Sequence, residues 1–261
     1  MKIALGQLSL HWEDKEANLK KVRTCLALLA SRQVSLFLLP EMSLTGFSMH
    51  TDKTKEVHRE TVQKVGELAR QYQTAIGVGW VKDLGALCEN HYSILAPEGE
   101  LLDYAKLHPF RYAGEHQYFQ GGTSLPVCIC EDFVIGVQIC YDLRFPEPFQ
   151  KLSKEADLIV VPANWPAKRR EHWQCLLKAR AIENMSYIAG VNCAGWMDGQ
   201  EYSGDSGLYA PDGAVLTPEV LPLDGCANEQ ILIYSLANDV CQYRNAFPVK
   251  EDRREDLYRI L

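Results

Sequence analysis

The chain alternates between apolar runs that are typical of buried strands and segments with the spacing of amphipathic helices. Helical faces are predicted at residues 19–29, 62–72 and 173–183, where apolar residues recur every three or four positions. The strand-like runs cover residues 3–8, 34–39, 74–81, 91–97, 133–140, 158–161, 187–193, 207–210 and 231–236. Apolar strands that alternate with helices indicate an α/β layer fold. No linker, repeat or low-complexity segment interrupts the pattern, so we expect one domain over residues 1–261.

The overall charge narrows the classes of partner. The 261 residues include 27 Lys+Arg and 34 Asp+Glu, for a net charge of −7, and contain no basic tract. Nucleic acids and anionic membrane surfaces are bound by clustered basic residues, so neither partner is expected. The apolar N-terminal stretch is interrupted by Gln7, Ser9, His11 and Glu13, unlike a signal peptide, and no run approaches the length of a membrane span. We therefore expect a cytoplasmic protein.

The cysteine content is high and odd, with nine residues, so at least one thiol is unpaired within the chain. In a reducing cytoplasm we expect all nine to be thiols, and most buried thiols behave as small apolar groups. Cys128 and Cys130 fall on an expected edge strand, and a C-x-C pair alone is too short to argue for zinc. The question is whether one cysteine differs from the others.

Three of the strand-like runs end in reactive or polar residues. LFLLPEM ends at Glu41, VIGVQICYD at Cys140, and LIVVPANWP at Asn164 and Trp165. Ligands of α/β sheets bind beyond the carboxyl ends of the strands, so these residues are candidates for a common site. The alternatives are a surface carboxylate for Glu41 and a buried core thiol for Cys140. A helix that begins near Pro146 is expected to favour the thiolate of Cys140.

A fourth candidate segment reads AKLHPFRYAGEHQYFQGG and follows the apolar run LLDYA. Lys106 comes directly after that run, and Arg111 and Glu115 follow within the segment. The alternative interpretation is a polar surface loop. The chain lacks both the G-x-G-x-x-G and the G-x-x-x-x-G-K-[ST] motif, so no nucleotide cofactor is expected.

These segments together resemble a known enzyme family. LPEMSLTGF, the lysine of AKLHPF and GVQICYDLRFPE are similar to the three signature segments of the nitrilase superfamily, the carbon–nitrogen hydrolases. The resemblance continues through VPANWP, HWQCLLKARAIENMSYIAGVN and GDSGLYAPDG, and within the superfamily it is greatest to bacterial omega-amidases. One departure is Pro109, where relatives often have leucine, and it puts the loop that carries Glu115 in doubt.

The resemblance implies a fold, an activity and a set of roles. The implied fold is a four-layer αββα sandwich of two stacked mixed sheets flanked by helices, commonly as a homodimer. The implied activity is hydrolysis of the terminal amide of 2-oxoglutaramate or a related dicarboxylic monoamide through a thioester, without a metal or organic cofactor. Cys140 is the implied nucleophile, Glu41 the general base and Glu115 a supporting residue. Lys106 and the backbone N–H of Tyr141 would stabilise the oxyanion.

A substrate carboxylate would need a cation in the pocket. Arg169 is our first candidate and Arg111 the second, followed by Lys168, whereas Arg144 is expected to pair with a carboxylate such as Glu147. Phe47 and Trp165 are expected as apolar walls, beside Tyr141 and Asn164.

Other functions remain open at this point. The nearest is another amidase of the superfamily, acting on a carbamoyl amide, a deaminated peptide or an aliphatic amide, and a nitrilase is a further possibility. A second chemistry is a Cys–His hydrolase in which Cys140 works with His108, His116 or His172. A third class is a non-catalytic binding protein with the same fold.

Overall fold

The computed structural model describes residues 1–258, and its larger sheet has eight strands. Their order is β14-β15-β1-β2-β4-β5-β6, with β3 paired to β4. The parallel pairs β1–β2 and β2–β4 lie at the centre, and antiparallel pairs flank them. The strands are β1 (Lys2–Gln7), β2 (Leu36–Leu38), β3 (Lys55–Glu56), β4 (Ala75–Asp83), β5 (Cys88–Ala96), β6 (Gly99–Ala105), β14 (Glu219–Pro222) and β15 (Gln230–Ser235).

The smaller sheet has five strands in the order β13-β10-β9-β8-β7, and it is also mixed. A separate two-stranded hairpin, β11–β12, follows β10 along the chain. The strands of the smaller sheet are β7 (Val127–Cys130), β8 (Phe133–Val137), β9 (Leu158–Ala163), β10 (Tyr187–Asn192) and β13 (Gly207–Tyr209), and those of the hairpin are β11 (Ala194–Met197) and β12 (Gln200–Ser203).

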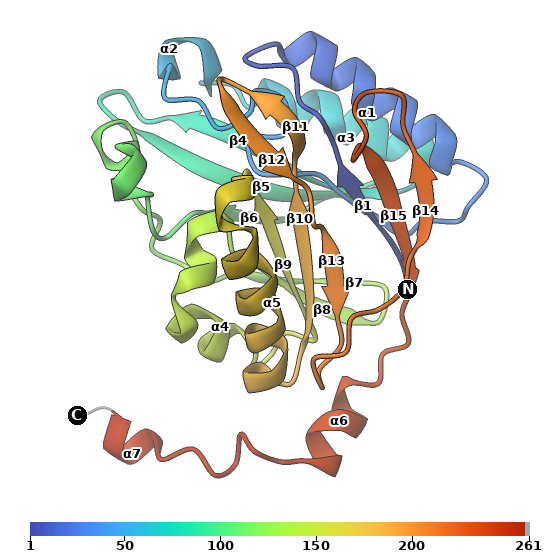
Figure 1. The fold of residues 1–261 in the computed structure, drawn as a ribbon, viewed down its shortest axis with the longest axis vertical. Helices are drawn as coiled ribbons and strands as arrows, with labels where there is room; N and C mark the ends of the chain where they lie inside the picture. Colours follow the sequence, from blue (N-terminus) through green and yellow to red (C-terminus); the bar gives the residue numbers. More distant parts are fainter. Residues whose placement is uncertain (259–261) are drawn as a thin grey trace.

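Helices cover the outer faces of the two sheets (Figure 1). α1 and α3 lie on the larger sheet, α4 and α5 lie on the smaller sheet, and α6 and α7 follow the last strand. The helices are α1 (Lys15–Leu29), α2 (Thr51–Thr54), α3 (Glu60–Tyr72), α4 (Pro146–Leu152), α5 (Arg170–Asn184), α6 (Val240–Ala246) and α7 (Glu255–Tyr258). Four short 3-10 turns are η1 (Arg111–Ala113), η2 (Glu115–Gln117), η3 (Cys140–Arg144) and η4 (Ala167–Arg169).

Alternate residues of the buried strands serve two different hydrophobic cores, because successive side chains of a strand point to opposite faces. In β1, Ile3 and Leu5 belong to the core between the sheets, whereas Ala4 belongs to the core beneath α1 and α3. In β2, Leu36 and Leu38 face the other sheet, and Phe37 between them faces the helices. This explains why both runs are apolar throughout, and it confirms the αββα sandwich.

Several boundaries differ from the sequence-based expectation. The run at 133–140 is a strand only as far as Val137, after which the chain turns and Cys140 begins η3. The short strands β3 and β14 and the hairpin β11–β12 were not predicted, because their sequences lack a sustained alternation of apolar and polar residues. No helix in the described part of the chain is long and apolar enough to span a membrane.

Candidate active site

Glu41 lies in a tight turn directly after β2, and its side chain is fully buried. The next residue, Met42, has a φ of +44°, and the turn packs against the backbone of β4. There the backbone N–H of Ser43 donates to the carbonyl of Gly79 at 3.0 Å, and the Gly79 N–H donates to Ser43 Oγ at 2.8 Å. A Cβ at position 79 would clash with the backbone of Glu41 and Met42, so this close approach requires glycine.

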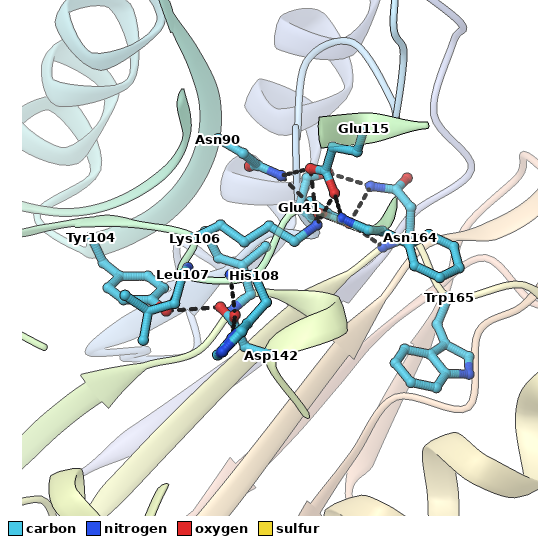
Figure 2. A network of polar contacts seen from close by, with 12 residues as sticks. Glu41, Asn90, Tyr104, Lys106, Leu107, His108, Glu115, Asp142, Asn164 and Trp165 are labelled. Atoms are coloured by element: carbon cyan, nitrogen blue, oxygen red, sulfur yellow. Dashed lines mark hydrogen bonds and ion pairs between the residues drawn. The ribbon is translucent and has the colours of Figure 1, made fainter. Parts of the chain in front are cut away.

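Lys106 comes directly after β6 and is 1% exposed. Its Nζ donates to Glu41 Oε1 at 2.9 Å and to Glu115 Oε2 at 2.9 Å, so one ammonium group joins two buried carboxyl groups (Figure 2). The loop after Pro109 also holds Glu115, because the backbone N–H of Phe110 donates to Glu115 Oε2. Proline at position 109 is therefore compatible with a well-placed Glu115.

The charge of Lys106 depends on these neighbours. Burial alone would lower the pKa of Lys106, but the charges of Glu115 and Glu41 outweigh it, so the pKa is raised above its usual value. Burial also raises the pKa of Glu115, an effect that the charge of Lys106 opposes. Lys106 is therefore an ammonium group at neutral pH, despite its burial.

Two asparagines complete the hydrogen bonding of Glu41. Asn90 Nδ2 donates to Glu41 Oε1 at 2.8 Å and to Glu115 Oε1 at 3.3 Å. Asn164 donates from its backbone N–H to Glu41 Oε2 at 3.0 Å and from Nδ2 to the Glu41 carbonyl at 2.7 Å. Asn164 was among the candidates from sequence, but Asn90 was missed. The available signal was a polar residue inside the buried run of β5.

Cys140 begins η3 in a left-handed conformation, with a φ of +47°, and it lines a cavity. Burial raises the pKa of the Cys140 thiol well above its usual value, and the nearby Glu41 raises it further. The expectation that the helix near Pro146 favours the thiolate is therefore wrong for the free protein. The helix begins after η3 has ended, and burial dominates.

The three histidines considered as partners for Cys140 have other contacts or are exposed. His108 Nδ1 lies 2.7 Å from Asp142 Oδ1, and His172 Nδ1 lies 3.3 Å from the Arg144 guanidinium. His116 is exposed in η2. The charged groups that act on the Cys140 thiol are carboxyl groups and an ammonium group. The geometry therefore favours a carboxyl group, rather than a histidine, as the proton acceptor.

The cavity that Cys140 lines has a volume of about 360 Å³. Of the predicted contacts, it is lined by Phe47, Tyr141, Asn164, Trp165 and Arg169, and the candidate cation Lys168 lines it as well. Arg111, the exposed first residue of η1, is not among the residues that line this cavity, although its neighbours Phe110 and Tyr112 are. Sequence reasoning missed the contribution of the β11–β12 hairpin, whose Met197, Asp198, Gln200 and Tyr202 also line the cavity.

Arg144 and Arg169 both line the cavity and lie over aromatic rings. The Arg144 guanidinium is 4.8 Å from the centre of the Trp165 ring, and that of Arg169 is 5.4 Å from the Phe110 ring. Burial and the charge of Arg169 lower the pKa of Arg144, which indicates that the two cations are close.

Among the residues that the structure describes, neither of these arginines has an acidic partner. Within residues 1–258, the arginines that form ion pairs are Arg32, Arg59, Arg170, Arg180, Arg253 and Arg254. The expected pairing of Arg144 with Glu147 is therefore wrong, because the Arg144 side chain turns toward the cavity and His172 instead. In the part of the chain that the structure describes, the cavity wall thus has two arginines without a carboxylate partner, together with Lys168, and it also includes the Cys140 thiol.

The chemistry of the cluster follows from its residue types. A thiol, a carboxyl group and an ammonium group can act as nucleophile, proton acceptor and stabiliser of developing negative charge. The described residues include no group of three or more His, Cys, Asp or Glu side chains arranged to hold a metal ion.

Comparison with known proteins identifies the family. Residues 2–239 match the carbon-nitrogen hydrolase family model. An omega-amidase YafV of Yersinia enterocolitica is 37% identical over 79% of this chain and 80% of its own. A 2-oxoglutaramate amidase of Bacillus subtilis (strain 168) is 29% identical over 98% of both chains. The solved structure of XC1258 from Xanthomonas campestris, a CN-hydrolase superfamily protein with an arsenic adduct in its active site, has a TM-score of 0.88 and 29% identity, and the match covers 98% of this chain and 97% of that one. The chain therefore belongs to the carbon–nitrogen hydrolase family, within the nitrilase superfamily, and is a hydrolase that acts on C–N bonds.

Proposed function

We propose that this hydrolase is an omega-amidase that removes the terminal amide of a small dicarboxylic monoamide such as 2-oxoglutaramate. The observation that carries the proposal is a cavity lined by the Cys140 thiol and by two arginines that have no acidic partner within residues 1–258. The buried cluster of Glu41, Lys106 and Glu115 lies close enough to the thiol to affect its pKa. The names of the relatives from Yersinia enterocolitica and Bacillus subtilis support this choice.

In the first step, Glu41 accepts the proton of the Cys140 thiol as the sulfur attacks the amide carbon. The raised pKa of Cys140 makes such an acceptor necessary, because few thiolates exist in the free enzyme at neutral pH. The new C–S bond places negative charge on the former carbonyl oxygen. Lys106 and the backbone N–H of Tyr141 stabilise that oxygen, and one such donor contributes about 3 kcal/mol.

In the second step, the C–N bond breaks and the nitrogen leaves as ammonia with the proton from Glu41. A thioester between the substrate acyl group and Cys140 remains. Glu41 then takes a proton from a water molecule, whose oxygen attacks the thioester carbon. The C–S bond breaks, the thiol regains its proton, and the carboxylic acid product leaves. Glu115 does not exchange protons in this scheme, and its role is to keep Lys106 charged and in place.

The carboxylate at the other end of the substrate is bound by Arg169 and Arg144. A guanidinium group can donate two parallel hydrogen bonds to one carboxylate. A half-buried arginine without an acidic partner is therefore expected to bind such a carboxylate strongly. A neutral amide would leave both cations without a counterion. This predicts a preference for anionic amides in a protein with a net charge of −7.

Ammonia release tests the proposal. The panel contains 2-oxoglutaramate, 2-oxosuccinamate, glutamine, a carbamoyl amide and an uncharged aliphatic amide. The expected result is the highest kcat/KM for the 2-oxo acid amides, with no release by Cys140→Ala. Highest activity on the carbamoyl or the aliphatic amide would assign the protein to another branch of the superfamily. Full activity of Cys140→Ala would overturn the nucleophile assignment.

A further inference from the structure

A second buried carboxylate lies beside the candidate catalytic cluster and has no part in the proposed chemistry. Asp142 follows Cys140 by two positions and is fully buried. Its Oδ1 accepts hydrogen bonds from the His108 backbone N–H at 2.9 Å and from His108 Nδ1 at 2.7 Å. Its Oδ2 accepts from the Tyr104 hydroxyl at 2.8 Å and from the Ile139 backbone N–H at 3.0 Å (Figure 2). Both oxygens therefore accept two hydrogen bonds each.

The donors come from two different sheets. Tyr104 lies in β6 of the larger sheet, and His108 follows that strand. Ile139 and Asp142 belong to the turn after β8 of the smaller sheet. Lys106 lies in the sequence between the two donors Tyr104 and His108. Cys140 lies between the donor Ile139 and the acceptor Asp142. The carboxylate of Asp142 thus joins the segment of the lysine to the segment of the cysteine.

The Tyr104 hydroxyl extends this connection. While it donates to Asp142, it accepts from the Leu107 backbone N–H at 3.3 Å and from Gln138 Nε2 at 3.1 Å. Burial and the charge of Asp142 raise the pKa of Tyr104 well above its usual value, so the phenol keeps its proton. One hydroxyl group therefore contacts Leu107, which is next to Lys106, and two residues that lie two positions before and after Cys140.

The conformation of Cys140 adds a reason for this arrangement. A residue with a side chain and a positive φ is strained, and it persists only where its surroundings fix it. The Asp142 carboxylate accepts from the Ile139 N–H, and the Asp142 N–H donates to the Ile139 carbonyl at 3.0 Å. These two bonds close the turn around Cys140.

We propose that Asp142 is a positioning residue that fixes Lys106 relative to Cys140 across the two sheets, with Tyr104 as its partner. This inference rests on the proposed roles of Lys106 and Cys140. Asparagine cannot replace Asp142, because its amide group would present N–H donors to one of the two pairs of donors that the carboxylate now satisfies. The substitution therefore moves one segment relative to the other while the rest of the core is unchanged.

The test compares Asp142→Asn and Tyr104→Phe with matched controls. Asp157→Asn alters a carboxylate that accepts from a backbone N–H at the other end of β8, and Tyr187→Phe removes a hydroxyl that bonds to Asp239. Ammonia release from 2-oxoglutaramate gives kcat and KM for each variant. Because a displacement of about 1 Å can cost about 100-fold in rate, we expect kcat to fall about 100-fold in Asp142→Asn, with KM within about twofold. We expect a smaller loss in Tyr104→Phe and unchanged kcat in both controls.

A second readout distinguishes positioning from a purely structural role. The rate of iodoacetamide alkylation of Cys140, followed by mass spectrometry of its peptide, reports the environment of the thiol without any substrate. We expect it to change in Asp142→Asn and to stay constant in Asp157→Asn. Wild-type kcat and alkylation rate in folded Asp142→Asn would overturn the inference. If Asp142→Asn does not fold, the test rests on Tyr104→Phe. An unchanged kcat in Tyr104→Phe would then overturn the inference. Failure of the wild-type protein to release ammonia would instead overturn the proposed function.

Discussion

At the scale of single residues, the buried cluster holds two carboxyl groups for one ammonium group. Lys106 donates to both Glu41 and Glu115, and the uncharged Asn90 donates to both as well. Removal of the only cation in the cluster would leave two carboxyl groups buried without a counterion, which is more costly than loss of an exposed ion pair. The consequence depends on pH, because a buried carboxyl group can take up a proton.

We predict that Lys106→Met destabilises the protein more at pH 8 than at pH 5. Burial already raises the pKa of Glu115, and loss of the ammonium group would raise it further. A carboxyl group with a raised folded-state pKa binds more protons folded than unfolded, so its destabilising effect grows as the pH rises through that range. Urea denaturation at the two pH values measures the difference. Lys20→Met, at an exposed position of α1, is the control, and an equal penalty at both pH values for Lys106→Met would contradict the prediction.

Glu41→Gln is expected to separate two properties of Cys140. Loss of a general base lowers kcat for ammonia release by about 1000-fold. Glu41 raises the pKa of the thiol, so its replacement by a neutral amide should lower that pKa and preserve or increase alkylation of Cys140 at pH 8. Steady-state kinetics and peptide mass spectrometry give the two values. If His108→Ala abolished turnover and Glu41→Gln did not, a Cys–His mechanism would replace the proposed mechanism in which Glu41 is the general base.

At the scale of elements, the positions of the candidate residues were largely predictable from strand ends. The runs that became β2, β8 and β9 lead to Glu41, Cys140 and Asn164, and these side chains do meet at one site. The layers of the fold could be predicted from the apolar runs, because the two faces of a buried strand contribute side chains to two different hydrophobic cores. The strands, the helices and the residues at the strand ends could therefore be predicted from local sequence patterns. The family resemblance supplied the predicted catalytic roles of these residues.

Other contributions to the site depend on tertiary packing and could not be predicted. Asn90 lies within β5 and reaches the cluster because β5 pairs with β6, which carries Lys106 at its end. The β11–β12 hairpin lines the cavity although its sequence has no catalytic signature. The sequence allowed the Arg144 side chain either to pair with Glu147 or to line the cavity. Only the three-dimensional structure shows that it lines the cavity.

A pair of glycine substitutions tests how closely β4 approaches the Glu41 turn. In Gly79→Ala the added methyl group meets the backbone of Glu41 and Met42, so we expect a loss of about 2 kcal/mol in the free energy of unfolding and a fall in kcat. Gly66 lies inside α3 with open space around it, so Gly66→Ala should add about 0.5–1 kcal/mol without changing kcat. Urea denaturation and ammonia release measure both effects. Wild-type stability in Gly79→Ala would show that the turn can move away from β4.

At the scale of the whole molecule, an acidic protein has to attract an anionic substrate with local charge. The net charge of −7 opposes approach of a carboxylate at long range, whereas Arg144 and Arg169 attract it at the cavity. Specificity for anionic amides should therefore depend on these two side chains rather than on the surface as a whole.

Arg169→Ala and Arg144→Ala are expected to raise KM for 2-oxoglutaramate by about tenfold or more each, since a charge-assisted hydrogen bond contributes about 1.5–3 kcal/mol. Activity on an uncharged aliphatic amide should change little. Initial-rate kinetics on both substrates make the comparison, and Arg111→Ala is the control because that residue does not line the cavity. Equal losses on the charged and the neutral amide would indicate misfolding instead of lost carboxylate binding.

Five of the nine thiols are expected to show three different reactivities toward iodoacetamide. Cys175 and Cys241 are exposed and should react with iodoacetamide first. Burial raises the pKa of Cys25 and of Cys128 to about 12, so these should react only after unfolding. Cys140 should react slowly and be the one thiol among these that 2-oxoglutaramate protects. Peptide mass spectrometry over time gives the order, and protection of Cys175 by substrate would contradict it.

The pairing of β1 with β15 has a consequence for synthesis of the chain on the ribosome. Residues 2–7 pair with residues 230–235 in antiparallel register, while β1 pairs with β2 on its other side. All the residues to which the proposed function assigns a role have been translated once Arg169 has been added, yet β1 still has an open edge at that moment. Unpaired backbone groups on such an edge can recruit a strand from another chain. During synthesis there is therefore a period in which these residues are present but the larger sheet still lacks β15. We expect the chain to depend most on chaperones during this period.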